Sequence, residues 1–447
     1  MTLTSGETGA GRWRPDASIL PDDWELQRLK YLGNLSPSNV DKKSNEEEPT
    51  VKLCNYTDVY YHENIDRTID FMEATTSERK IERFELQKGD ILFTKDSESS
   101  DDIGVPAFVS EDLDNVICGY HLFIIRPNEE KVDPEYLYWA IKSKYVNFQF
   151  EGAATGVTRV GLSLRDASDT WIPVPPRDQQ SQMVDYIKSR DSEVEKLIRE
   201  KKNLINILEE KRESTIEDHL TPGLNAEDDF GTASWSVNLP DEWSLTRGNG
   251  LFYEVDKKSE DGEEMLFSLR KDQGLVPHSE VSEKELEPED LEGYKKVQTG
   301  QLVMNRMRAA TGLIDVAPSD GIVSPDYAIF ETKEKANPHF YQLLFQTELY
   351  KTMFRSRSIG LGTGSAGFLR LYSDRFLSLQ FPHPPIETQK QIVSEVEEQL
   401  HLIDDLSNKT EKSIEQLKER RNAIITCVVT GQIDTTGTKN PVQEQIS

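Results

Sequence analysis

The same ordered series of motifs occurs twice along the chain. The segment Leu20–Trp24 (LPDDW) recurs as Leu239–Trp243 (LPDEW), and a turn followed by an apolar strand at 88–93 recurs at 299–304. Ordered repetition on this scale means that one structural unit is built twice, which constrains the fold more than any single local pattern does. The sequence therefore predicts two similar halves.

Each copy ends in a long helix. A double proline at 175–176, and again at 384–385, ends a strand, and a helix begins within two residues of it. Upstream, short apolar strands alternate with polar turns, and a helix starts with proline in its first turn. Each copy is therefore an α+β globule followed by a helix of about 40 residues, which makes a rod of roughly 60 Å. The predicted parts are a tail at 1–19, a globule at 20–176, a spacer helix at 177–222, a linker at 223–238, a second globule at 239–385, a second spacer helix at 386–431 and a tail at 432–447.

Both predicted helices carry one narrow apolar stripe. The stripe residues are Val194, Leu197, Leu204 and Leu208 in the first helix, and Val396, Ile403, Leu406, Ile414, Leu417, Ile424 and Val428 in the second. Two such stripes can bury each other in an antiparallel coiled coil. This predicts an α+β fold in which two similar globules, related by an internal pseudo-two-fold repeat, are joined by two long antiparallel helices. An alternative stays open, in which each helix only completes a globule's core, because Lys201 and Thr410 fall on or near the seam.

The chain as a whole is strongly acidic. Its 52 Lys and Arg residues against 80 Asp and Glu give a formal net charge of −28, which on average opposes binding to nucleic acid or to an anionic membrane. The three cysteines are far apart in the sequence and odd in number, which disfavours a disulfide framework or a paired-cysteine zinc module. With neither an apolar leader nor an apolar stretch of membrane-spanning length in the sequence, we expect a cytoplasmic protein.

Taken together, the repeated motifs resemble the specificity subunit of type I restriction–modification systems. The resemblance runs from Leu20 to Asp434. It is carried by the two LPD(D/E)W segments, by Gly156–Arg159 with Gly161–Ser163, by the glutamines at the two helix starts, and by the segment 417–434. No single motif decides it, but the ordered duplication is specific.

The resemblance implies a function and a set of partners. Each globule would be a target recognition domain that reads one half of an asymmetric, bipartite DNA site, while the helices set the spacer and dock two methyltransferase subunits. Motor-nuclease subunits would be further partners. The chain itself would be non-catalytic and without a metal or cofactor, with S-adenosylmethionine, ATP and Mg²⁺ on partner subunits. The expected partner-docking residues are Gln180, Gln389, Arg212 and Arg421. A coiled-coil interaction scaffold that binds no DNA is the alternative.

Three basic islands interrupt the acidic sequence. The segments 142–165, 295–308 and 351–376 each carry an excess of Lys and Arg. Two of them also contain glycine-rich loops, which suit close approach of the backbone to phosphate. Arg is the side chain that bonds guanine in bidentate fashion. The candidates for DNA contact are Lys142, Lys144, Arg159, Arg165, Arg306, Arg308, Arg355, Arg357 and Arg370. The alternative for any one of them is an ordinary solvated surface charge.

Motifs for catalysis are weak. Asn337–Phe340 is similar to the base-holding motif of adenine methyltransferases, but His339 replaces its second proline and no cofactor-binding turn precedes it. Gly362, Gly364 and Gly367 have the spacing of a dinucleotide-binding loop, but they run into a strand-like segment instead of a helix. The sequence has no phosphate-binding P-loop, and its histidines have no metal-ligand spacing. We therefore expect catalysis to belong to other chains.

Overall fold

The computed structural model describes residues 17–42, 45–224, 239–271, 273–282, 286–361 and 368–435. Most of both predicted tails, most of the predicted linker and the three glycines of the 362–367 loop lie outside the described residues. The chain divides into two compact units. Unit 1 comprises residues 1–200 and 412–447, and unit 2 comprises residues 201–411. Within them we name residues 17–176 globule 1 and residues 239–385 globule 2.

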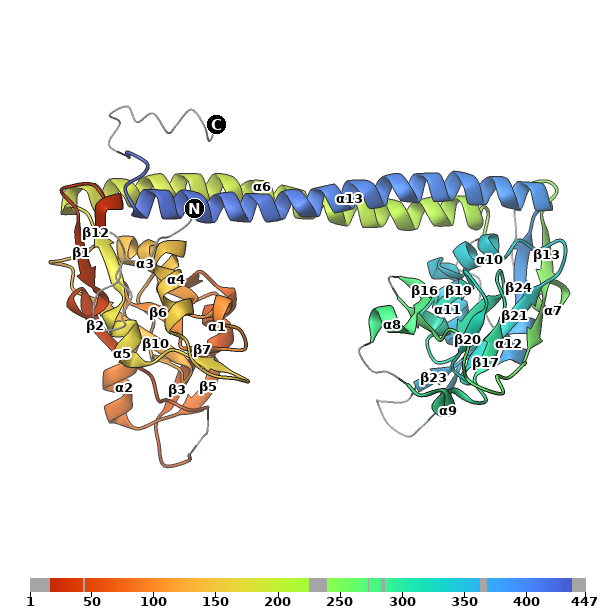
Figure 1. The fold of residues 1–447 in the computed structure, drawn as a ribbon, viewed down its shortest axis with the longest axis horizontal. Helices are drawn as coiled ribbons and strands as arrows, with labels where there is room; N and C mark the ends of the chain where they lie inside the picture. The colour runs from red at the N-terminus through yellow and green to blue at the C-terminus, as the bar shows by residue number, and fades with distance from the viewer. Residues whose placement is uncertain are drawn as a thin grey trace. The chain divides into compact units, whose positions relative to one another are not determined.

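Globule 1 is built on a five-stranded sheet of order β2-β10-β6-β8-β4, accompanied by the ladders β5-β3-β9, β1-β12 and β11-β7 (Figure 1). Strand β6 is buried along its whole length: three of its residues are apolar, and the hydroxyl of Thr94 accepts a hydrogen bond from the N–H of Val105. The strands are β1 (Glu25–Arg28), β2 (Gly33–Pro37), β3 (Thr50–Cys54), β4 (Asn64–Ile65), β5 (Met72–Thr75), β6 (Ile91–Thr94), β7 (Asp96–Ser97), β8 (Pro106–Val109), β9 (Val116–Cys118), β10 (Leu122–Pro127), β11 (Val160–Gly161) and β12 (Trp171–Val174). The helices are α1 (Tyr56–Tyr61), α2 (Glu78–Phe84), α3 (Pro134–Lys142), α4 (Lys144–Ala153) and α5 (Leu164–Asp169).

Globule 2 is built on a four-stranded sheet of order β14-β21-β18-β19, with the ladders β13-β24, β15-β16, β17-β20 and β22-β23. The strands are β13 (Ser244–Arg247), β14 (Phe252–Val255), β15 (Phe267–Arg270), β16 (Gly274–Pro277), β17 (Lys295–Val297), β18 (Leu302–Asn305), β19 (Ile314–Val316), β20 (Gly321–Val323), β21 (Tyr327–Thr332), β22 (Ile359–Leu361), β23 (Phe368–Arg370) and β24 (Gln380–His383). The helices are α7 (Gly248–Leu251), α8 (His278–Val281), α9 (Pro288–Leu291), α10 (Pro338–Phe345), α11 (Glu348–Arg357) and α12 (Ser373–Ser378).

The repeat seen in the sequence is also a repeat of topology. The first strand of each globule pairs antiparallel with its last strand, β1 with β12 and β13 with β24. The strand order β2-β10-β6-β8 has its counterpart in β14-β21-β18-β19. In both globules the strand that follows the repeated turn, β6 or β18, lies inside the main sheet. One mixed α+β unit is thus built twice.

Two long helices complete the fold, α6 (Arg177–Leu220) and α13 (Ile386–Val429). Each helix contributes residues to both units, so the compact units do not coincide with the parts predicted in chain order. In unit 1 the first part of α6 lies antiparallel to the last part of α13, and in unit 2 the last part of α6 lies antiparallel to the first part of α13 (Figure 1). The predicted α+β fold with two long antiparallel helices is confirmed.

The far end of each helix also packs into a globule. In unit 1, Val428 and Val429 of α13 belong to the core formed by β6, β10 and α3. In unit 2, Ile216 and Leu220 of α6 belong to the core formed by β14, β18 and α10. The alternative, in which each helix only completes a globule's core, therefore holds at the helix ends, because apolar residues of those ends pack into the globule cores.

The predicted stripes are only partly buried. Val194, Leu208 and Ile414 are buried, and Thr410 is accommodated because its hydroxyl donates to the carbonyl of Leu406 at 2.7 Å. However, Leu197 and Leu406 are each 44% exposed, which corrects their assignment to the buried seam. No helix in the described part of the chain has both the length and the apolar character to span a membrane.

Two cysteines that are distant in the sequence are neighbours in the fold. Cys54 of β3 and Cys118 of β9 stand opposite each other in a parallel register, and both are free and buried. Burial raises the pKa of both thiols well above the ordinary value, so they behave as small apolar core residues.

Candidate nucleic-acid interface

The glutamine at the start of each long helix ties that helix to its globule. Gln180 accepts a hydrogen bond from the backbone N–H of Asp133 at 2.7 Å, and Gln389 accepts from the N–H of Asn337 at 2.8 Å. Each side chain also donates to the proline carbonyl five residues earlier. Both glutamines are buried. The expectation that they face a partner is therefore wrong, because their amides are used inside the fold.

Replacing Gln389 with leucine is expected to destabilise unit 2. The change leaves the buried carbonyl of Pro384 and the part-buried N–H of Asn337 without this partner, at about 1–3 kcal/mol for each unsatisfied group. Urea unfolding, with hydrogen exchange of unit 2 peptides, measures the loss. The control is Gln391→Leu, because Gln391 is exposed and bonds only Glu395 on the next turn. Equal stability of the two variants would contradict the assigned role.

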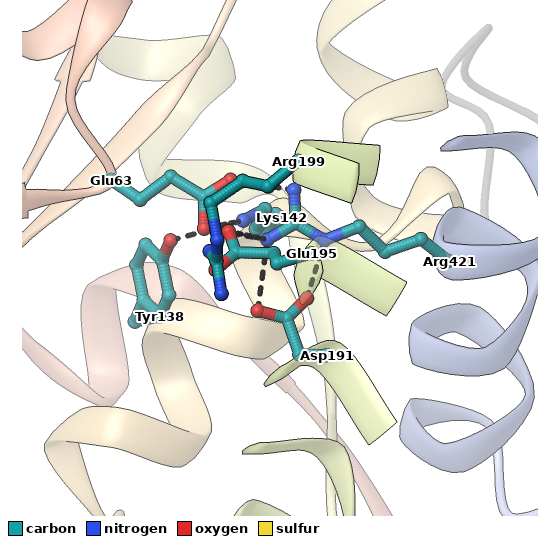
Figure 2. Close-up of polar contacts among 7 residues, drawn as sticks. All are labelled: Glu63, Tyr138, Lys142, Asp191, Glu195, Arg199 and Arg421. Atoms are coloured by element: carbon teal, nitrogen blue, oxygen red, sulfur yellow. Dashed lines mark hydrogen bonds and ion pairs between the residues drawn. The ribbon is translucent and has the colours of Figure 1, made fainter. Parts of the chain in front are cut away.

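A partly buried ion-pair cluster joins globule 1 to both helices within unit 1 (Figure 2). Arg421 of α13 forms a two-point ion pair with Asp191 of α6. The same guanidinium bonds both oxygens of Glu63, at 2.7 and 2.8 Å, and reaches Glu195 at 3.3 Å. Its side chain is only 15% exposed. Arg421 is thus held by globule 1 and by α6 within unit 1 and is not available as a docking residue, which corrects that expectation.

Lys142 completes this cluster. Its ammonium lies 2.5 Å from Glu63 and 4.9 Å above the ring of Trp139. Burial lowers the pKa of Lys142, although Glu63 opposes that shift. Burial alone would raise the pKa of Glu63, but Lys142 and Arg421 outweigh it and the pKa lies below its ordinary value. Lys142 is therefore a structural cation, and its prediction as a DNA contact is wrong.

Three carboxylates of this cluster have oxygens within 4.8 Å of one another, a spacing that could hold a cation. Those carboxylates belong to Glu63, Asp191 and Glu195. The guanidinium of Arg421 contacts all three, so the positive charge they require is supplied by the chain itself.

The corresponding arginine of the second copy has a different environment. Arg212, which the repeat aligns with Arg421, forms an ion pair with Asp404 between α6 and α13 of unit 2. Its side chain is 39% exposed and that of Asp404 is 53% exposed. Among the residues that the structure describes, Arg212 has this one ion pair, so its side chain remains accessible as a docking residue.

A second repeated feature lies at the end of the central strand of each globule. Lys95 follows β6, and its carbonyl accepts a hydrogen bond from the N–H of Leu162 at 2.8 Å. Arg306 follows β18, and its carbonyl accepts from the N–H of Leu371 at 2.9 Å. We call this point, where the chain returning from a loop meets a basic residue at a strand end, the loop junction.

In unit 1 the loop junction carries an exposed arginine. Arg159 of the loop is exposed and forms an ion pair with Asp96 of β7 at 2.7 Å. Lys144 at the start of α4 and Arg165 on α5 are also exposed, and Lys144 pairs with Glu151 on its own helix. These three cations can reach a ligand from solvent.

In unit 2 the arginines fall into two groups. Arg308, Arg355 and Arg357 are exposed. By contrast, Arg306 is mostly buried and held by Glu254 at 2.5 Å, and Arg370 is held by Asp326 at 3.1 Å, with its guanidinium 5.5 Å from the Tyr372 ring. These two fasten β23 and its junction to the sheet, so their prediction as direct DNA contacts is replaced by an anchoring role.

Comparison with known proteins identifies the family to which this chain belongs. The sequence pattern of the family described as the type I restriction modification DNA specificity domain matches residues 21–206 and 262–416. The chain belongs to this family. It is therefore a type I specificity subunit, the component that determines DNA sequence specificity and is not catalytic.

Individual relatives agree with this assignment. The specificity subunit of the MjaX type I restriction enzyme of Methanocaldococcus jannaschii is 24% identical over 432 residues, which cover 93% of this chain and 94% of that one. The MjaVIII specificity subunit of the same organism is 23% identical over 201 residues, 42% of this chain and 46% of that one. A solved chain from work on complex assembly and conformational transition of a type I restriction–modification system has a TM-score of 0.66 at 17% identity, covering 93% of this chain and 99% of that chain. The fold is shared.

Sequence reasoning missed several residues around the loop junction of the specificity subunit. Lys95, Tyr120 and His121 were outside every predicted island, because a single cation beside acids does not stand out in a charge count. The signal was present in the repeat itself. Lys95 and Arg306 each follow the aligned strands, so extending the alignment of 88–93 with 299–304 by two residues pairs the two cations.

Proposed function

We propose that each globule of this specificity subunit reads one half of an asymmetric bipartite DNA site through its loop junction. The observation that supports this most is the repetition of the junction with different side chains. Lys95 and Arg159 stand at it in unit 1, while in unit 2 Arg306 and Arg370 anchor the junction and the exposed Arg308 lies two residues beyond it. Similar scaffolds that present different side chains read different sequences, so two unlike half-sites follow.

The two long helices set the number of unread base pairs and dock two methyltransferase subunits in this proposal. An apolar residue is exposed at the same repeat position of each helix, Leu197 in unit 1 and Leu406 in unit 2. A surface that occurs twice favours two copies of one partner. Motor-nuclease subunits join the complex, and S-adenosylmethionine, ATP and Mg²⁺ bind to those partners. The site of action would be chromosomal DNA in the cytoplasm.

The net charge of −28 is compatible with this proposal because DNA meets a local surface. Exposed cations concentrate near the loops, at Arg159 and Arg165 in unit 1 and at Arg308, Arg355 and Arg357 in unit 2. The acidic remainder repels phosphate, so strong binding would need the methyltransferase subunits as well.

The proposal is tested with the assembled complex of this chain and its methyltransferase subunits. Sequencing that detects methylated adenine should reveal one motif made of two specific blocks and an unspecific spacer. Titration at fixed salt should then show tighter binding to a duplex with that motif than to a scrambled duplex. A motif with one contiguous block, or equal affinity for both duplexes, would refute the proposal.

Charging the exposed leucines is expected to remove methyltransferase subunits one at a time. Leu197→Glu should leave a complex with one subunit, and the Leu197→Glu, Leu406→Glu double variant should bind none, because a carboxylate would be buried in each apolar contact. A contact residue of this kind contributes about 2 kcal/mol or more, roughly 30-fold in affinity. Native mass spectrometry counts the subunits. Met265→Glu is the control, since Met265 is an exposed apolar residue of globule 2; full assembly of the double variant would exclude this surface.

A further inference from the structure

The loop between α4 and β11 in unit 1 is a closed and well-defined structure. The backbones of Thr155 and Gly161 exchange two hydrogen bonds, at 2.9 and 3.1 Å, which close the loop at its base. β11 pairs with β7, so the base is fixed to the strand that follows the loop junction. Gly156 has φ +147°, and a Cβ there would collide with the carbonyl oxygen of Arg159. The loop therefore presents Arg159 in one backbone conformation.

The side chain of Arg159 is held from one side only. One guanidinium nitrogen, Nη2, bonds Asp96 at 2.7 Å. Asp96 is 16% exposed and also bonds Nδ1 of His121 at 2.8 and 2.9 Å, whereas Arg159 is 53% exposed. The carboxylate is thus fixed behind the guanidinium, and the outer part of the guanidinium faces solvent.

Aromatic rings and a second cation surround this pair. His121 packs edge-on against Tyr120 at 4.5 Å, and the ammonium of Lys95 lies 4.2 Å from the Tyr120 ring. Tyr56 of α1 also lies near Arg159 and Asp96, and it stacks on Tyr60, which meets the 74% exposed Tyr61 edge-on. Flat rings and cations at the rim of an exposed arginine are suited to contact with bases and sugar-phosphate.

We propose that Arg159 reads a guanine in the half-site of unit 1 and that Asp96 is the positioning residue for it. Arg recognises guanine by donating two hydrogen bonds to O6 and N7 in the major groove. A guanidinium oriented beforehand by a carboxylate loses less side-chain freedom on binding and keeps one fixed direction. The inference rests on the proposed function and adds the base and the two residues that select it.

The experiment measures discrimination at single base pairs with the assembled complex. Duplexes carry the mapped motif or a substitution at each guanine of the half-site read by unit 1. Arg159→Ala should lose roughly 5- to 150-fold of discrimination at one guanine only. Arg159→Lys, which keeps the charge but not the fork, should lose it at the same position. Asp96→Asn should give a smaller loss there, and its effect should not add to that of Arg159→Ala. The control is Arg67→Ala, an exposed arginine of unit 1 paired with Glu111.

Two results would overturn the inference. Equal weakening for every duplex, with a smaller salt dependence, would mean that Arg159 contacts phosphate. Unchanged discrimination in both Arg159 variants would mean that it contacts no base. In either case the unmodified complex would still distinguish its motif from a scrambled duplex, so the proposed function would survive. If the unmodified complex shows no preference, the proposed function itself fails.

Discussion

Replacing Arg421 with alanine should destabilise unit 1 by about 3–5 kcal/mol, because it leaves the carboxylate of Asp191, only 12% exposed, without its cation and leaves Glu63 with Lys142 alone. The effect should fall on globule 1 as well as on the helices, since Glu63 belongs to the globule while Asp191 belongs to α6. Urea unfolding gives the size of the loss, and hydrogen exchange of unit 1 peptides shows where it falls.

The chain contains a matched control for this prediction. Arg212 occupies the same repeat position, but its ion pair with Asp404 is exposed, and such pairs contribute about 0–1 kcal/mol. Arg212→Ala should therefore cost unit 2 much less than Arg421→Ala costs unit 1. A double-mutant cycle with Glu63→Gln should show strong coupling to Arg421, because the two side chains share hydrogen bonds. Similar losses in the two arginine variants would show that burial does not set the strength of these pairs.

The two copies are thus connected to their helices by different interactions. In unit 1 charged groups of globule 1, α6 and α13 meet in one partly buried cluster. In unit 2 the helix ends enter a core of aromatic rings that includes Phe252, Phe345 and Phe381. The repeated backbone is kept while the chemistry of the contact differs, so acid should act more strongly on this contact in unit 1, because protonation of Glu63, whose pKa lies below its ordinary value, removes a partner of Arg421.

The repeat made much of the fold predictable. Two globules of the same type and two long helices follow from motif order, helix starts and apolar periodicity, all of which are local in the sequence. The direction of polar side chains is not local. Gln180 and Gln389 lie in polar first turns of helices, which suggests exposure. Both side chains nevertheless point into the fold, where each accepts a hydrogen bond from a backbone N–H of the preceding globule.

The candidate site was predictable only as a region. The islands marked the loops correctly as basic, but the sequence cannot distinguish a cation that faces solvent from one that meets a distant carboxylate. Lys142 and Glu63 are 79 positions apart and become partners only through the tertiary fold. Likewise, Arg306 is anchored by Glu254, 52 positions earlier on β14, whereas Arg308, two residues on, is exposed.

The loop that carries Arg159 gives the second large expected effect. Gly156→Val should remove recognition of the half-site of unit 1, because a side chain at φ +147° that collides with the Arg159 carbonyl forces the loop onto another path. Holding valine in the original conformation would cost about 1–3 kcal/mol of backbone strain before the collision is counted.

Gly152→Val is the matched control for Gly156→Val. A Cβ at Gly152 meets nothing within 4 Å, and the residue lies four positions earlier on the exposed side of α4. Binding to duplexes in which one half-site is scrambled shows whether the variant complex still recognises each half-site. In the Gly156→Val complex, scrambling the half-site of unit 1 should no longer matter, while scrambling the other half-site should still weaken binding. If both half-sites keep their full effect, the conformation of this loop is not what selects the sequence, and the specificity of globule 1 must come from another part of its surface.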